Sequence, residues 1–254
     1  MRASTKVIKH KFDNKITIIP ISDVHIGSIE CNESAWKNFC EYLQKTPDIY
    51  IILVGDLINN SVRNAVANPF DETLRPRDQK YKMIEYLKPI KHKILAAVSG
   101  NHEYRTKKDS DGDITYDILC TLDLENLYRE DTAFIKLQCG SAAYGLAMTH
   151  GTGGGALTGS GINKNERFSY VIEGLDCFVT GHTHKGAVTR PVRLVFDLNH
   201  STIAQRSCTV VTAESWLNYS GYAMRKMLLP AEGCCPQKLT FNNSKDTKRI
   251  IVEW

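Results

Sequence analysis

With 254 residues, the chain is long enough to bury a large core, and it contains no linker that would divide it, so we expect one α/β domain over residues 1–254. Hydrophobic residues at 42% and charged residues at 24% exclude a disordered chain, and a formal net charge of +4 permits contact with a polyanion without indicating one. A polar, basic start and the lack of any apolar run of about 18 residues lead us to expect a cytoplasmic protein that does not contact a membrane.

The first half of the chain alternates strand patterns with helix patterns. Runs of apolar, often β-branched residues predict strands at residues 15–22, 48–54 and 93–98. Amphipathic stretches predict helices at residues 34–45 and 79–87. Because strands alternate with helices, we expect a parallel sheet with crossover connections. Residues 59–78 are too long for a simple connection, and a lid over the site and a solvated surface loop are equal alternatives for them.

A charged segment at residues 105–113 precedes a helix that we predict at residues 114–128. Asp109, Asp111 and Asp113 alternate as they do in a calcium-binding loop. Such a loop needs a glutamate at its twelfth position, where this chain has a cysteine. We therefore interpret the segment as a loop that caps the following helix.

Strand patterns dominate the rest of the chain. Two runs joined by Gly140 and Ser141 predict a β-hairpin at residues 133–139 and 142–149. A helix at residues 163–173 and a strand at residues 177–180 are predicted next. Short alternating strands are then predicted at residues 187–198, 207–212, 224–229 and 249–252. Their pattern favours antiparallel pairing, and therefore a mixed sheet or a second sheet packed on the first.

The eight cysteines are scattered, and no Cys-x-x-Cys pair occurs. Since no export signal is present, we expect reduced, mostly buried thiols and not disulfides. The lack of a thiolate cluster also argues against a structural zinc site.

Five short motifs place potential metal ligands at the ends of predicted strands. They are Asp23-Val24-His25, Gly55-Asp56, Asn101-His102, His150-Gly151 and Gly181-His182-Thr183-His184. Most of them, taken alone, are as easily explained by an ordinary turn, a helix cap or an isolated histidine. Five such motifs in this order, each after an apolar run, indicate that the strand ends bring their donors to one place.

The donors are sufficient for a site with two metal ions. Seven side chains could meet there: Asp23, His25, Asp56, Asn101, His150, His182 and His184. In an extended segment, residues two apart point the same way, so the Asp-x-His and His-x-His pairs can each aim at one point. Mixed carboxylate, amide and imidazole ligands suit Mn, Fe or Zn better than Ca. Two cations about 3.5 to 4 Å apart can hold a phosphate group and lower the pKa of a bridging water, which is the chemistry of phosphoester hydrolysis.

The ordered motifs resemble those of the calcineurin-like metallophosphoesterase family, and the resemblance spans Asp23 to His184. It implies an α/β fold of the α-β-β-α sandwich type, with two mixed sheets flanked by helices. It also implies two divalent ions, one held by Asp23, His25, Asp56 and His184 and the other by Asp56, Asn101, His150 and His182. Manganese is the expected metal, with Fe, Zn or Ni as alternatives. His102 matches the family histidine beside the leaving oxygen, so the expected catalytic residues are His102, Asp56 and Asn101.

The sequence departs from the protein Ser/Thr phosphatases of this family. Those enzymes carry Asp-Arg-Gly after the Gly-Asp motif, whereas this chain has Leu57-Ile58-Asn59-Asn60. The segment from Ser22 to Gly27 is more similar to the repair-type nucleases and to the lipid or nucleotide phosphodiesterases. Gly100 to Arg105 and His150-Gly151 also resemble small phosphoesterases of bacteria and their viruses.

We therefore expect a phosphodiesterase that acts on a nucleotide or on single-stranded nucleic acid. Three loop arginines are candidates for contacts with substrate phosphates, with a solvated surface as the equal alternative: Arg63, Arg75 and Arg105. A phosphomonoesterase of broad specificity and a non-catalytic binding scaffold remain alternatives. The relative activity on a diester and a monoester distinguishes a phosphomonoesterase from the expected phosphodiesterase. Substitution of Asp56 or His102 distinguishes a non-catalytic scaffold from an enzyme.

Overall fold

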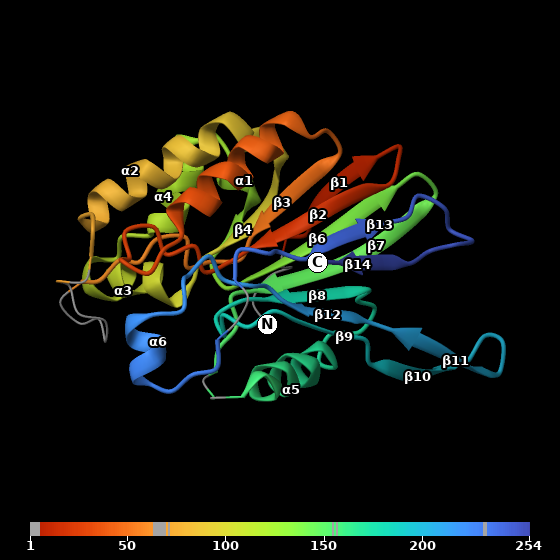
Figure 1. Ribbon diagram of the computed structural model, residues 1–254. Helices are drawn as coiled ribbons and strands as arrows, with labels where there is room; N and C mark the ends of the chain where they lie inside the picture. The colour runs from red at the N-terminus through yellow and green to blue at the C-terminus, as the bar shows by residue number, and fades with distance from the viewer. Residues whose placement is uncertain (1–5, 63–69, 71, 154, 156, 231–232) are drawn as a thin grey trace.

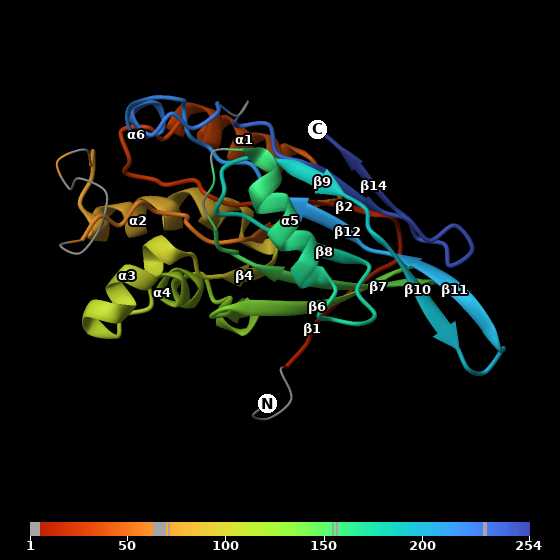
Figure 2. The same ribbon diagram turned by 90° about the horizontal axis from the view of Figure 1, so that it is seen from below.

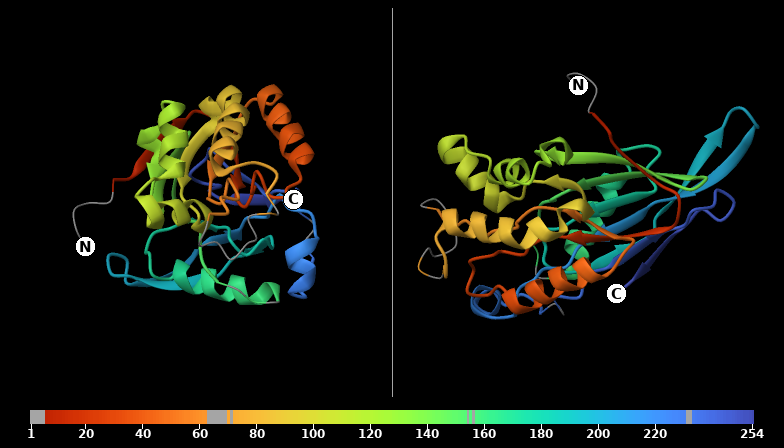
Figure 3. Two further views of the ribbon diagram at one scale, coloured as in Figure 1. Left: turned by 90° about the vertical axis from the view of Figure 1, so that its left-hand side faces the viewer. Right: turned by 90° about the horizontal axis from the view of Figure 1, so that it is seen from above.

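The protein is described by a computed structural model that covers residues 6–62, 70, 72–153, 155, 157–230 and 233–254. Two six-stranded sheets pack against each other, and helices lie on the outer face of each sheet (Figure 1). Figure 3 shows these layers from the end of the molecule, with the helices of the first half of the chain on one side and α5 (Thr158–Ser169) on the other. The arrangement confirms the expected α-β-β-α sandwich.

The first sheet has the strand order β14-β13-β2-β3-β4-β5. Its strands are β2 (Ile16–Ile21), β3 (Ile49–Leu53), β4 (Ile94–Val98), β5 (Tyr128–Arg129), β13 (Lys238–Phe241) and β14 (Ile250–Glu253). Strands β2 to β5 are parallel, and β13 and β14 add an antiparallel edge. The helices over this sheet are α1 (Glu33–Lys45), α2 (Pro76–Leu87) and α4 (Ile114–Thr121), with 3-10 turns at Lys88–Lys93 and Glu125–Leu127.

The second sheet has the order β1-β6-β7-β8-β12-β9. Its strands are β1 (Ile8–Phe12), β6 (Thr132–Cys139), β7 (Ala142–Thr149), β8 (Cys177–Thr180), β9 (Ala187–Thr189) and β12 (Thr209–Thr212). A separate hairpin of β10 (Val192–Asp197) and β11 (Thr202–Ser207) projects from the body of the molecule (Figure 2). Two further helices, α3 (Asn101–Ser110) and α6 (Gly221–Arg225), lie near the ends of the strands (Figure 1).

Three apolar clusters hold the layers together. One lies between the sheets and includes Ile18, Val54 and Leu137. A second, which includes Trp36 and Leu43, lies between the first sheet and its helices, and a smaller one lies under α5. Because both faces of the central parallel strands are covered, their sequences are continuous apolar runs, which is why they could be predicted.

One helix was not predicted from the sequence, and another begins earlier than predicted. Residues 105–113 were expected to form a loop, but α3 begins at Asn101 and continues to Ser110. This helix buries only Glu103, so it has no apolar stripe to reveal it. Helix α5, expected at residues 163–173, begins at Thr158 and ends at Ser169, and the helix expected at residues 114–128 ends at Thr121.

The prediction for the end of the chain is partly wrong. The strand expected at residues 224–229 is absent, and α6 occupies Gly221–Arg225 instead. Apolar side chains in this segment are exposed, and that of Met227 is 84% accessible. The apolar run therefore lies at the surface and does not form a buried strand. The short strands β1 and β13 were not predicted, although the late antiparallel pairing was. Within the expected lid at residues 59–78, residues 63–69 and 71 lie outside the described part of the chain.

All eight cysteines are free thiols, four of them buried and four half-buried. Burial raises the pKa of Cys40 to about 12, which keeps this thiol protonated and unreactive. Among the described residues, no helix combines the length and the apolar character that crossing a membrane requires.

Candidate metal centre

The seven predicted ligands follow the carboxyl ends of five strands, β2, β3, β4, β7 and β8. Six of them lie in loops, and Asn101 is the first residue of α3. The first three of these strands belong to one sheet and the last two to the other. Parallel strands in the same sheet end at one edge, so their following loops are neighbours. The structure brings all seven side chains together there.

The first group of donors surrounds Asp23, which is fully buried. Asp23 Oδ1 lies 3.1 Å from His184 Nε2 and 3.7 Å from His25 Nε2. The two imidazole nitrogens, His25 Nε2 and His184 Nε2, are 3.3 Å apart. Asp23 Oδ2 accepts a hydrogen bond from the backbone N–H of His182 at 2.9 Å, which fixes the orientation of the carboxylate.

The second group surrounds Asn101. Its Oδ1 lies 2.7 Å from His182 Nδ1 and 3.0 Å from His150 Nε2, and these two nitrogens are 3.3 Å apart. The opposite nitrogen of each ring is held by a backbone carbonyl, His150 Nδ1 by Val54 at 2.7 Å and His182 Nε2 by Gly153 at 2.9 Å. Such carbonyl contacts fix the tautomer, so His150 Nε2 and His182 Nδ1 are left to face the site.

Asp56 connects the two groups. Its Oδ2 lies 3.2 Å from His150 Nε2, 3.7 Å from His102 Nε2 and 3.8 Å from His25 Nε2. Its Oδ1 accepts the backbone N–H of His102 at 2.8 Å. Because one carboxylate faces donors of both groups, it occupies the position that a bridging ligand needs.

The backbone conformation that aims these side chains was not the expected one. Five donors have left-handed φ angles between 51° and 69°: Asp23, His25, Asp56, His182 and His184. The i, i+2 pairs therefore share a direction because left-handed residues alternate with ordinary ones, and not because the segments are extended. A left-handed residue other than glycine costs about 1 to 2 kcal/mol, so this arrangement is strained and has to be held by the surrounding structure.

Close backbone approaches explain the glycines in two motifs. A Cβ atom on Gly100 would overlap with the carboxylate and the backbone N of Asp56. A Cβ atom on Gly181 would overlap with Ser22 Oγ and would lie 2.8 Å from Asp23 Oδ2. Each glycine thus lets one ligand loop pass directly against another.

Glu103 fixes the loop that carries Asp56, and it was not among the candidate site residues chosen from the sequence. Its side chain is 1% exposed, and its two oxygens accept four backbone N–H groups. These come from Asp56, Leu57, Ile58 and Gly100, at 2.7 to 3.1 Å. The only sequence signal was its place two residues after Asn101, in the first turn of a helix.

The donor set fits divalent cations. Two ligands bound at about 2.1 Å from one cation lie about 3.0 to 3.4 Å apart, close to the separations observed within each group. The buried Asp23 Oδ1 has no hydrogen-bond partner of acceptable geometry among the described residues, and a cation would satisfy it. Three overlapping groups of His and Asp donors could each hold an ion, namely Asp23, His25 and His184; His25, Asp56 and His102; and Asp56, His150 and His182.

Charge pairing within the site is strong. Burial alone would raise the pKa of Asp56, but the imidazoles of His150 and His102 hold this pKa well below its usual value. Burial alone would lower the pKa of His150, yet the carboxylates of Asp56 and Asp23 raise it to about 10. Two buried anions that attract protons onto neighbouring rings would also attract metal cations.

The family model for calcineurin-like phosphoesterases matches residues 16–186, from the start of β2 to just beyond His184. The chain belongs to the calcineurin-like phosphoesterase family. Family membership makes it a metal-dependent phosphoester hydrolase. A comparison with curated proteins finds no match.

Two solved structures are similar to this calcineurin-like phosphoesterase. One is a candidate 5'-nucleotidase from Staphylococcus aureus in complex with alpha-ketoglutarate, with 14% identity and a TM-score of 0.50 over 94% of this chain and 53% of that one. The other is the calcineurin-like phosphoesterase YfkN from Bacillus subtilis, with 11% identity and a TM-score of 0.42 over 94% of this chain and 90% of that one. The present chain thus spans about half the length of the Staphylococcus aureus protein.

His102 and Arg105 of this phosphoesterase lie at the edge of the donor cluster. His102 Nδ1–H donates to the carbonyl of Asn59 at 2.6 Å, and Arg105 Nη2 donates to His102 Nε2 at 2.9 Å. Burial lowers the pKa of His102 to about 3 against the attraction of Asp56. Arg105 also donates to the Asn59 carbonyl at 3.1 Å, so the guanidinium is fixed beside the imidazole.

The other two predicted arginines are not placed at the site. Arg75 precedes the first turn of α2 and is exposed, and no contact among the described residues links its side chain to the seven donors. Arg63 lies outside the described residues. The structure therefore brings the seven predicted ligands together with His102 and Arg105. It gives no position for Arg63 and places Arg75 away from the site.

Proposed function

We propose that this chain hydrolyses phosphodiester bonds, with a nucleotide or single-stranded nucleic acid as substrate. The observation that carries this proposal is the convergence of seven oxygen and nitrogen donors from two sheets on one point. A shared core between the sheets supports a single domain over residues 1–254. The similarity to the solved structures concerns the fold alone, so the substrate class is inferred from the site.

We assign the donors to two cation positions. One position would be held by Asp23, His25, Asp56 and His184, and the other by Asp56, Asn101, His150 and His182. Asp56 would bridge them, which its contacts to His25 on one side and His150 on the other support. We expect Mn²⁺, because mixed carboxylate, amide and imidazole donors suit this ion, with Fe, Zn or Ni as alternatives.

Bound divalent ions would stabilise the charge of a phosphate group and activate a water molecule as the nucleophile. The protein's own residues would orient the substrate. Arg105, which now donates to His102 Nε2, can turn its guanidinium to a phosphate oxygen and release that imidazole nitrogen. His102 Nε2, no longer beside the guanidinium that lowers the pKa of this ring, would take a proton from solvent and pass it to the leaving oxygen, while the Nδ1–H stays on the Asn59 carbonyl.

A second candidate function is hydrolysis of nucleotide monoesters. It is favoured by the Staphylococcus aureus structure, whose description is that of a candidate 5'-nucleotidase. The two functions differ in the charge and size of the group beside His102, since a diester carries a second ester group where a monoester carries a free oxygen. The arginine beside this imidazole provides one positive charge, which suits the single negative charge of a diester.

Initial rates with Mn²⁺ on bis-p-nitrophenyl phosphate and p-nitrophenyl phosphate test the choice. We expect a higher kcat/KM for the diester, and a marked preference for the monoester would refute it. Single-stranded DNA, cyclic nucleotides and mononucleotides then narrow the substrate class. Asp56→Asn serves as the control for contaminating activity, and a scaffold function would be indicated only if wild type and this variant were equally inactive on every substrate.

A further inference from the structure

A second polar cavity lies away from the donor cluster, at the opposite end of β8. It has a volume of about 520 Å³, which is within the range of sites for nucleotide-sized ligands. Its floor includes Cys208 and Thr209, at the start of β12, and Asp176 precedes the first residue of β8. The ligand loops follow the last residue of β8, so the length of this strand separates the cavity from the metal centre.

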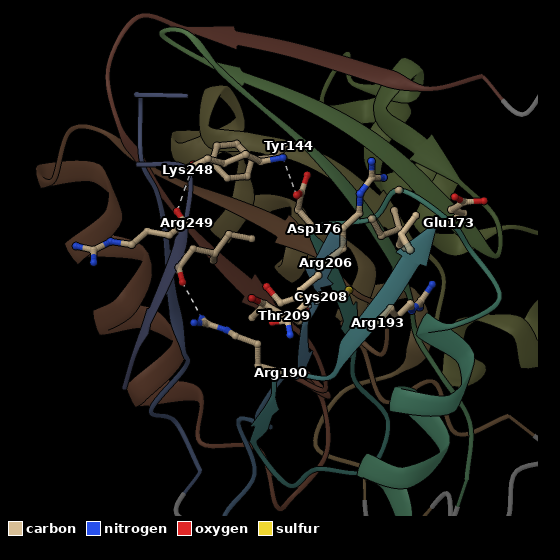
Figure 4. A pocket seen from close by; sticks show the side chains of 16 residues that line it. Tyr144, Glu173, Asp176, Arg190, Arg193, Arg206, Cys208, Thr209, Lys248 and Arg249 are labelled. Atoms are coloured by element: carbon tan, nitrogen blue, oxygen red, sulfur yellow. Dashed lines mark hydrogen bonds and ion pairs between the residues drawn. The ribbon is translucent and has the colours of Figure 1, made fainter. Parts of the chain in front are cut away.

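Arginines from the projecting hairpin line one wall of this cavity (Figure 4). Arg193 on β10 and Arg206 on β11 are directly paired in the antiparallel register. Like charges directly opposite each other destabilise a two-stranded sheet, and this hairpin has no third strand to support it. Their repulsion therefore weakens the hairpin, whereas an anion between the two guanidinium groups would turn the repulsion into binding.

Two of the cavity's guanidinium groups are held in place by protein contacts. Arg193 donates to the carbonyl of Ser169 and stacks on the ring of Tyr170 at 4.5 Å from its centroid. Arg190 donates to the carbonyl of Ile250 at 2.8 Å. Long side chains that are already ordered lose little entropy when a ligand binds, so these contacts prepare the cavity for an anion.

The acidic residues of the cavity do not cancel this charge. Asp176 is paired with Lys248 at 2.6 Å and accepts the backbone N–H of Gly145 at 2.8 Å. Glu173 is the other carboxylate in the lining. Once Asp176 and Lys248 are taken as a neutral pair, the lining holds four arginines and one carboxylate: Arg190, Arg193, Arg206 and Arg249 against Glu173.

We propose that this cavity is a second, metal-independent binding site for the phosphate groups of a nucleotide-sized anion. The forked guanidinium groups match phosphate oxygens, and the volume admits a whole nucleotide or the end of a nucleic-acid strand. The site is separate from the hydrolytic centre and does not rest on the function proposed for it. Arg206 supplies the central contact: within the described part of the chain its guanidinium makes no hydrogen bond, although its charge also acts on the carboxylate of Asp197.

Calorimetric titration of the full chain tests this proposal. Inorganic phosphate, adenosine 5'-monophosphate and a ten-residue single-stranded oligonucleotide are titrated with Mn²⁺ present and again after EDTA, which removes metal-dependent binding. We expect binding to persist in EDTA and to weaken at least tenfold in Arg206→Gln, since a charge-assisted contact is lost. Arg206→Lys should be intermediate, because it keeps the charge but not the fork.

Arg167→Gln on the outer face of α5 is the matched control, and its affinity should equal that of the wild type. Arg206→Gln should also melt at the same or a higher temperature without ligand, because it relieves the repulsion from Arg193. Preference for the mononucleotide or for the oligonucleotide identifies the source of the phosphate. The proposal fails if no probe binds in EDTA, or if Arg206→Gln and Arg167→Gln bind every probe equally well.

Discussion

Replacement of Glu103 by glutamine tests how the metal centre is positioned. The buried carboxylate accepts four backbone N–H groups, two on each oxygen. Glutamine keeps one acceptor oxygen, but its amide NH₂ would face the other two donors. Each N–H left unsatisfied in the interior costs about 1 to 3 kcal/mol, so Glu103→Gln should lose about 2 to 6 kcal/mol of stability.

Thermal unfolding followed by circular dichroism measures this loss. For a chain of this size, each kcal/mol shifts the Tm by about 2 to 4 °C, so a decrease of about 4 to 24 °C is expected. Glu130→Gln is the control, because Glu130 is exposed and its carboxylate pairs, among the described residues, with Lys107 at 2.7 Å. This variant should shift the Tm by less than about 2 °C. An equal Tm for Glu103→Gln and Glu130→Gln, together with wild-type metal binding by Glu103→Gln, would refute this positioning role of Glu103.

Four further outcomes are expected. Asp56→Asn should reduce the bound metal from two ions to one or none by elemental analysis, and retention of two ions would exclude a bridging role. His102→Ala should retain both ions but lose about 10²- to 10⁴-fold in kcat, the usual scale for a positioned acid or base; a loss of metal instead would make His102 a ligand. Arg105→Gln should raise KM with little change in metal content, and an unchanged KM would separate Arg105 from substrate binding. EDTA should lower the Tm of the wild type, and added Mn²⁺ should restore it in a concentration-dependent way; a Tm indifferent to both would mean that no ion binds the native state preferentially.

The central parallel strands, and the donors that follow them in the sequence, could be predicted because these strands are buried on both faces. Ile49–Leu53 and Ile94–Val98 are apolar throughout, so the polar residues that follow them mark the strand ends clearly. Edge strand β1 alternates buried Ile8 with exposed Lys9 and Lys11 and escapes notice among other polar residues. Burial on both faces thus made the central strands predictable from the sequence, whereas an edge strand such as β1 was not.

The finer geometry of the site could not be predicted. The left-handed conformation at Asp23 and Asp56 depends on contacts between loops distant in sequence, such as the bond from Asp23 N–H to the Gly55 carbonyl. Glu103 was missed because it looks like an ordinary charged residue in a charged segment, and only its burial reveals its function. Arg75 was selected for its place in a loop, a criterion that says nothing about the direction of a side chain.

Each group of donors takes residues from both sheets, and this has a consequence for how the protein is made. A nascent chain that has emerged as far as β4 carries Asp23, His25, Asp56 and Asn101 nearby, but lacks the histidines that face them. These are supplied by the second sheet, with His184 arriving last. Binding of metal by the full set of donors would therefore have to follow the synthesis of His184, and the bound ions would link the two sheets to each other.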